Sequence, residues 1–116
     1  MKINKKNAFA LWEEHYGDDV YAEDFHGNLM YKFAYGRRDY FKGRGKYMIY
    51  CGWNIHHILP IARGGTSDKV NLLCTNIHTN ECAGDKLTFW IDEDQYQVKK
   101  IKGKRIYKIV RIELYN

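Results

Sequence analysis

The sequence predicts an α+β fold in a single domain over residues 1–116. Near the N-terminus, apolar side chains recur at helical spacing, whereas three segments near the C-terminus alternate apolar and polar residues as strands do. A length of 116 residues suits one domain, and a hydrophobic content of 45% is enough to build a globular core. Between these two parts lies a stretch rich in His, Asn and Gly, which we expect to carry the chemistry.

The N-terminal third is expected to contain two helices and a strand. Apolar residues at helical spacing predict a helix over 4–16, and Gly17 is a suitable C-terminal stop. Residues 18–25 (DDVYAEDF) are expected to form a second short helix with an Asp cap. After the turn at 26–28 (HGN), the aromatic segment 29–35 (LMYKFAY) has the composition of a strand.

The rest of the chain is expected to combine short strands, one helix and glycine-rich loops. A basic loop is predicted over 36–46, a strand over 53–58 that Pro60 ends, a loop over 62–68, a brief strand or turn over 71–75 and a short helix over 77–84. Three strands then form an antiparallel β-meander: 87–91, 96–101 and 105–114.

The net charge of +5 is unevenly distributed. Residues 1–24 hold three Lys and six acids, a local charge of −3, so the remaining residues carry +8. The stretch 37–46 has five Lys or Arg and one Asp, and the stretch 99–111 has seven Lys or Arg and no acid. Such stretches can follow a phosphate backbone, or they can form the solvated face of an ordinary basic protein.

Composition also argues against several classes of protein. No apolar run approaches the ~20 residues of a membrane helix, and the first residues lack the apolar core of a signal peptide. We therefore expect a soluble, cytoplasmic protein without a membrane partner. The three cysteines contain no C-x-x-C pair, which argues for reduced thiols rather than a disulfide framework.

The central stretch holds three blocks of polar residues at defined spacings. They are HHILPxxxGG over 56–65, Asn71 followed by Leu72, and NxxxGDK over 80–86. Asn71 lies 14 residues after His57, and Asn80 lies nine residues after Asn71. This pattern resembles the HNH endonucleases, the ββα-metal (His-Me finger) nucleases, and the match covers about 53–86. More loosely, the chain is similar to small standalone phage or bacterial members of that family.

The resemblance implies a role for each matched residue. His57 takes the position of the general base, which removes a proton from the water that attacks phosphorus. Asn71 takes the position of the residue that holds the loop and orients the base. His56 and Asn80 take the positions of the ligands of one divalent metal ion, which stabilises charge on the phosphate and on the leaving oxygen.

The metal site departs from the family pattern at both ligand positions. The first ligand is often Asp and the last is often His, whereas this chain has His56 and Asn80. These neutral ligands should bind Mg²⁺ weakly without DNA, and imidazole also suits Mn²⁺, Ni²⁺ or Zn²⁺. We therefore expect the metal to bind together with the nucleic acid.

His78 competes with Asn80 for the last ligand position. Residues i and i+2 do not share a helix face, so only one of the two can point at His56.

Adjacent residues of a strand point to opposite faces, so the two histidines can serve one phosphate only where the strand twists or ends. Phosphate contacts are expected from basic residues beside the site and in the basic loop. They are Arg63, Lys86, Arg37, Arg38, Lys42, Arg44 and Lys46.

Three functions fit the sequence. The first is a DNA endonuclease that nicks or cuts both strands; cutting both strands needs a homodimer or two successive nicks. The second is a nucleic-acid-binding module without catalysis, in which the histidines are structural. The third is an RNA-directed nuclease.

Overall fold

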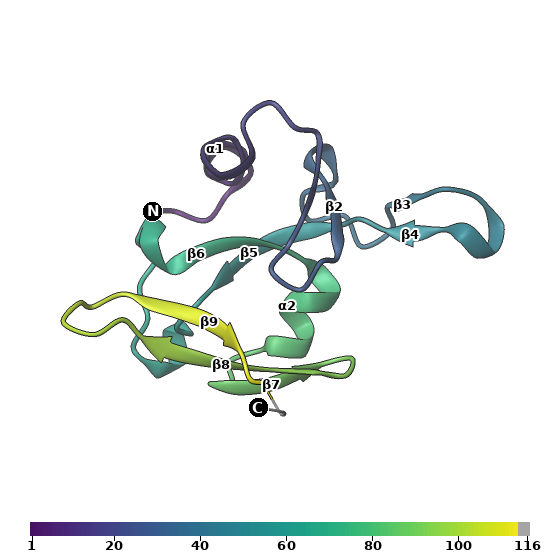
Figure 1. The fold of residues 1–116 in the computed structure, drawn as a ribbon. Coiled ribbons are helices and arrows are strands. Elements are labelled where there is room, and N and C mark those ends of the chain that lie inside the picture. The colour runs from purple at the N-terminus through teal and green to yellow at the C-terminus, as the bar shows by residue number, and fades with distance from the viewer. Residues whose placement is uncertain (114–116) are drawn as a thin grey trace.

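The computed structural model describes residues 1–113 and has an α+β architecture. Helix α1 (Lys5–Tyr16) lies on one side of an antiparallel hairpin made of β5 (Trp53–His57) and β6 (Leu72–Asn76). Helix α2 (Ile77–Ala83) lies on the other side (Figure 1). The β5–β6 hairpin is therefore enclosed between an N-terminal and a C-terminal layer.

Three further sheets complete the fold, and all of them are antiparallel. Strand β1 (Tyr21–Glu23) pairs with β2 (Leu29–Tyr31), and β3 (Phe41–Lys42) pairs with β4 (Ile49–Tyr50). The C-terminal sheet has the order β7-β8-β9, with strands Thr88–Ile91, Asp94–Lys100 and Tyr107–Arg111. Short 3₁₀ turns occupy Lys32–Ala34, Gly45–Tyr47, Ile61–Arg63 and Lys69–Asn71.

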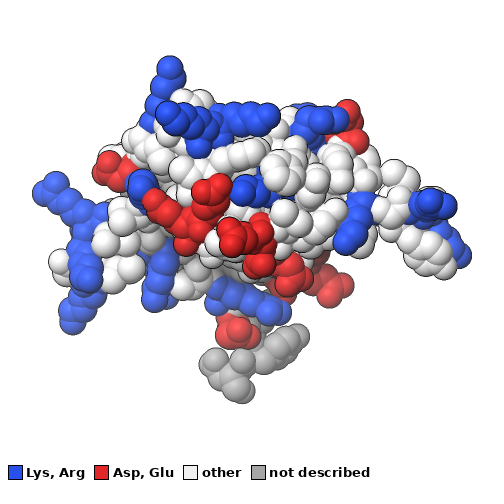
Figure 2. Space-filling model, turned by 90° about the horizontal axis from the view of Figure 1, so that it is seen from above, with Lys and Arg blue, Asp and Glu red and all other residues white. Residues whose placement is uncertain are grey.

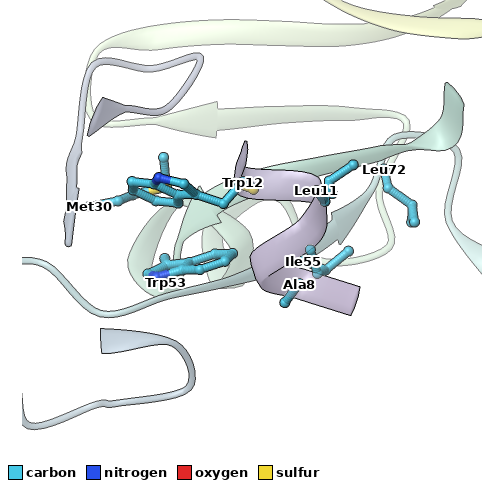
Figure 3. Packing of buried hydrophobic residues seen from close by; sticks show 8 residues of the cluster. Ala8, Leu11, Trp12, Met30, Trp53, Ile55 and Leu72 are labelled. Carbon is cyan, nitrogen blue, oxygen red and sulfur yellow. The ribbon is translucent and has the colours of Figure 1, made fainter. Parts of the chain in front are cut away.

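The first hydrophobic core joins α1 to the β5–β6 hairpin. The rings of Trp12 and Trp53 pack with centroids 4.9 Å apart, and both side chains are fully buried. Figure 3 shows these rings beside Met30 and, farther along the helix, Leu11 near Ile55 and Leu72. At about 1.5–3 kcal/mol for each large apolar side chain removed from water, this cluster fixes α1 against the hairpin.

A second core lies under α2 and holds it on the C-terminal sheet. Ala83 of the helix packs with Phe89, Ile91 and Tyr96 of the sheet. Phe25, from the turn between β1 and β2, also contacts this core. The C-terminal sheet thus supports α2 from the side opposite to the β5–β6 hairpin.

The first helix is confirmed with both ends. Asn4 caps it by accepting a hydrogen bond from the backbone N–H of Asn7, at 2.8 Å. Gly17 ends it with φ of 59°, a conformation that glycine adopts without strain. The β5, β6, α2 and β7 segments and the C-terminal meander are also found near their predicted ranges, although residue 114 of the last predicted strand lies outside the described residues.

The second N-terminal helix was a wrong prediction, so one N-terminal helix is present where two were expected. Residues 21–23 form strand β1, because Tyr21 stacks on Tyr31 of β2 with ring centroids 4.8 Å apart. The carboxyl group of Asp24 closes the turn by accepting hydrogen bonds from the backbone N–H groups of His26 and Asn28. Asp24, near the end of the predicted helix, therefore stabilises a hairpin turn.

Two other predictions in this region need correction. The strand predicted over 29–35 ends at Tyr31, where a 3₁₀ turn begins. The loop predicted over 36–46 contains strand β3, which pairs through two residues with β4. Strands of two or three residues are too short for alternation to be visible in the sequence.

Candidate functional site

The candidate site is built on the β5–β6 hairpin and the helix that follows it. The register pairs His57 with Leu72 and His56 with Leu73. Asn76, the last residue of β6, caps α2 by accepting a hydrogen bond from the backbone N–H of His78, at 2.9 Å. The cap turns the chain directly from strand into helix, which carries Asn80 back over β5.

His57 lies at the last position of β5, where its side chain is half-buried. Its Nε2 atom is 3.0 Å from the hydroxyl oxygen of Ser67, in the connection between β5 and β6. Burial lowers the pKa of His57 below its usual value, which favours the neutral imidazole. A neutral imidazole held at one nitrogen has the other nitrogen available to accept a proton.

His56 faces the opposite way, against α2, and only 4% of it is exposed. Its Nδ1 atom is 2.5 Å from the side-chain oxygen of Asn80. Asn80 in turn donates from Nδ2 to the side-chain oxygen of Asn54, at 2.6 Å. Burial lowers the pKa of His56, an effect that its hydrogen bond to Asn80 partly opposes.

Both histidines nevertheless line one pocket of about 280 Å³. The pocket lies between the end of β5, the start of the following connection and the end of α2. Its lining residues are Ile55, His56, His57, Pro60, Ile61, Ala62, Asn80, Gly84 and Asp85. The end of the strand therefore brings two neighbouring side chains to one space, although they approach it from different sides.

Asn71 fastens the connection that borders this pocket. Its side-chain oxygen accepts a hydrogen bond from the N–H of Leu59, at 2.9 Å. Its amide nitrogen donates to the carbonyl oxygens of Leu59 and Thr66, at 3.0 and 2.8 Å. Asn71 thus holds the segment that carries Ser67, and it acts on His57 through that segment.

The paired glycines of the connection have a backbone role. Gly64 has φ of 93°, in the left-handed region that favours glycine. A Cβ atom at Gly65 would lie 1.8 Å from the carbonyl oxygen of Leu59, so a larger residue would displace the chain. These two positions allow the connection to fold back on Leu59, next to the amide of Asn71.

The structure separates the two candidates for the last metal-ligand position. Asn80 contacts His56, whereas His78 is exposed and lies near Cys82, with Nε2 and Sγ 3.7 Å apart. The side chains that can hold a divalent ion at this pocket are therefore one imidazole and one amide, with Asp85 at the rim. Within residues 1–113, no group of three His, Cys, Asp or Glu side chains is arranged to hold a metal ion.

The basic residues expected to contact phosphate fall into two groups. Arg63 follows the pocket-lining Ala62 and donates from Nε to the carbonyl oxygen of Asp85, at 3.1 Å. Lys86 follows Asp85 in the chain and is exposed. The others lie on or before the β3–β4 hairpin, which projects from the fold in Figure 1, and none of them lines the pocket: Arg37, Arg38, Lys42, Arg44 and Lys46. They are not brought together with the histidines.

Sequence reasoning missed Ser67, Asn54 and the position of Asp85. Asp85 belongs to the NxxxGDK block, so its presence was visible, but its place at the pocket rim was not. Ser67 and Asn54 carry no local signal, because their roles depend on contacts made through the folded connection and the helix.

Comparisons with protein-family models, with curated proteins and with solved structures found no match to this chain. No helix within the described part of the chain is long and apolar enough to cross a membrane.

Proposed function

We propose that this protein is a metal-dependent endonuclease that hydrolyses phosphodiester bonds of DNA, with a ββα-metal core over residues 53–86. The observation that carries the proposal is that His56, His57 and Asn80 border one pocket beside a loop that Asn71 fastens. These are the residue types that metal-assisted phosphodiester hydrolysis requires: a neutral base, a residue that positions it, and metal ligands.

His57 acts as the general base. With Nε2–H donating to the Ser67 hydroxyl oxygen, the lone pair of Nδ1 remains available to take a proton from water. That water attacks the phosphorus atom, and the 3′-oxygen leaves. Ser67 and Asn71 are positioning residues, because Ser67 holds the imidazole and Asn71 holds the segment that carries Ser67.

The donor set fits a divalent ion that also binds phosphate. His56 and Asn80 supply one nitrogen and one oxygen that lie 2.5 Å apart in a hydrogen bond, so an ion held by both atoms would have to replace the proton that they share. When bound, the ion would act as a Lewis acid on the phosphate and on the leaving oxygen. Two neutral ligands leave several coordination positions for water and phosphate oxygens, so we expect metal and DNA to bind together.

DNA reaches the pocket past Arg63 and Lys86, and the cations of the β3–β4 hairpin extend the basic surface. One active site cuts one strand at a time, so cutting both strands requires a homodimer or two successive nicks.

The test is cleavage of supercoiled plasmid by the purified protein and by His57→Ala, in EDTA and with Mg²⁺, Mn²⁺, Ni²⁺ or Zn²⁺. The proposal predicts metal-dependent nicking that falls by about 10³-fold in His57→Ala, since a general base contributes roughly 10²–10⁴-fold. DNA binding and the melting temperature should stay nearly unchanged. Absence of cleavage with every metal, with DNA binding retained, would instead indicate a binding module, and preferred cleavage of RNA would indicate an RNA nuclease.

A further inference from the structure

The two basic stretches of the chain differ in how their charges are paired. In the first, Arg37 forms an ion pair with Asp39 at 3.0 Å, and Arg38 forms one with Glu81. In the second, six exposed cations have no acidic partner among the described residues: Lys99, Lys100, Lys102, Lys104, Arg105 and Lys108. Only Arg111, at the end of that stretch, is paired, with Asp94. The second stretch therefore keeps its positive charge available.

These six cations lie on and beside the turn that joins β8 to β9. The turn is closed by a hydrogen bond from the N–H of Ile101 to the carbonyl oxygen of Ile106, at 2.7 Å, and Gly103 has φ of 77°. In Figure 1 this turn projects at the left end of the molecule, and Figure 2 shows Lys and Arg side chains gathered at that end. The acidic side chains visible in Figure 2 lie mainly in the middle of the face.

A hollow of about 330 Å³ separates this hairpin from the connection between β5 and β6. The hairpin side of the hollow is formed by Lys100, Arg105, Ile106 and Tyr107. The other side is formed by Leu59, Gly64, Gly65, Thr66, Asp68, Val70 and Asn71. Among the residues that line this hollow, one is acidic: Asp68, whose carboxylate accepts a hydrogen bond from the Thr66 hydroxyl at 3.0 Å.

The same connection borders the candidate active site. Leu59 and Asn71 line the hollow, while Pro60, Ile61 and Ala62 line the pocket of the two histidines. Ser67, which holds His57, lies between hollow-lining residues of this connection. A phosphate backbone seated along the β8–β9 hairpin would therefore run next to the segment that positions the base.

We propose that the β8–β9 hairpin, with its six unpaired cations and the adjoining hollow, is the principal surface that binds the backbone of duplex DNA. This inference rests on the proposed function and names the surface that serves it. The first basic stretch, on and before the β3–β4 hairpin, is secondary, because Asp39 and Glu81 already pair with Arg37 and Arg38. Contacts of this kind are independent of base sequence and strongly dependent on salt, because each neutralised phosphate releases counterions.

The experiment measures binding of a short fluorescein-labelled DNA duplex by anisotropy, in EDTA so that no metal-dependent cleavage occurs, over a series of salt concentrations. The hairpin variant is Lys100→Gln/Lys104→Gln/Arg105→Gln, and the matched control is Arg37→Gln/Arg38→Gln/Lys42→Gln. Each removes three positive charges. The hairpin variant should weaken binding by about 10- to 100-fold and reduce the slope of log affinity against log salt by about 2–3. The control variant should weaken binding by less than about 3-fold, since two of its three charges are paired.

Equal losses in the two variants, or a larger loss in the control, would overturn the proposal. So would polyglutamate that displaces the duplex at equal charge concentration, or an RNA duplex that binds more tightly than DNA. Thermal melting checks the folding of each variant. If the triple variant is unstable, a second variant confined to the exposed turn replaces it: Lys102→Gln/Lys104→Gln. This variant should still reduce the salt slope by about 1–2. The two proposals fail separately, because binding is measured without metal. Absence of plasmid cleavage by the wild-type protein contradicts the nuclease proposal. A salt slope that is unchanged in the hairpin variant contradicts the proposed DNA-binding surface.

Discussion

His56 and His57 are neighbours in the chain, yet they belong to two regions with different physical character. The region of His56 is the interface between β5 and α2, where the side chain is buried and bonded to Asn80. The region of His57 is the edge of the β5–β6 connection, where the side chain is half-buried and bonded to Ser67. Because successive strand residues point to opposite faces, a single dipeptide can supply both a metal ligand and a base at the end of a strand.

The largest effect should come from breaking the connection on the His57 side. Asn71→Ala removes three hydrogen bonds and leaves one N–H and two carbonyl groups without their partner. We expect it to lower the free energy of unfolding by about 2–4 kcal/mol, measured by urea denaturation. The control is Asn7→Ala, whose half-buried side chain makes an exposed hydrogen bond to the carbonyl oxygen of Lys2, and it should change stability by less than about 0.5 kcal/mol. Equal effects would show that Asn71 does not fasten the connection.

The two histidines should differ in their effect on stability. His56→Ala opens space at a buried interface and leaves the side-chain oxygen of Asn80 without its partner, so we expect a loss of about 1–3 kcal/mol. His57→Ala should cost less than about 1 kcal/mol, because its side chain is half-buried and Ser67 can bond to water. Thermal or urea unfolding of both variants measures the difference, and a larger loss in His57→Ala would reverse the assignment of the two regions.

If His57 is the base, as we propose, removing its partner Ser67 should lower the rate of cleavage and leave the fold intact. Ser67→Ala loses the hydroxyl that holds Nε2 of His57, and we expect kcat for plasmid nicking to fall by about 10-fold with KM unchanged. Ser67→Thr keeps the hydroxyl and should restore most of the rate. A rise in KM, or a fall in melting temperature, that matches the loss of rate would indicate a structural role for Ser67 instead.

The smallest effect concerns the choice of metal on the His56 side. An imidazole and an amide suit Mn²⁺ or Ni²⁺ better than Mg²⁺, so nicking should be faster with Mn²⁺ or Ni²⁺ by about 3- to 10-fold. Initial rates with each ion at equal concentration measure this preference. Equal or faster nicking with Mg²⁺ would argue against His56 as a direct ligand.

Sequence reasoning recovered the elements that have a regular pattern or a terminal signal. Helix α1 was visible from its apolar spacing and Gly17, and the short helix expected over 77–84 is found as α2, with Asn76 and Gly84 as its caps. The short β1–β2 and β3–β4 hairpins were not visible, since their strands are fixed by aromatic contacts between segments such as Tyr21 and Tyr31. In the site, the roles of the His and Asn residues were expected from the resemblance to the HNH endonucleases, and they stay predictions. The bond between Ser67 and His57 was not expected, because it depends on the three-dimensional course of the connection.

The most direct test of the separate roles proposed for His56 and His57 is Mn²⁺ binding, measured by electron paramagnetic resonance. The measurement is made with a DNA duplex whose backbone is substituted to resist cleavage. The wild-type protein, His57→Ala and His56→Ala are compared at equal concentrations. We predict that His57→Ala binds Mn²⁺ as tightly as the wild type, whereas His56→Ala binds it at least about 10-fold more weakly. Retention of Mn²⁺ by His56→Ala, or an equal loss in His57→Ala, would contradict the assignment of the metal to one histidine and of the base to the other.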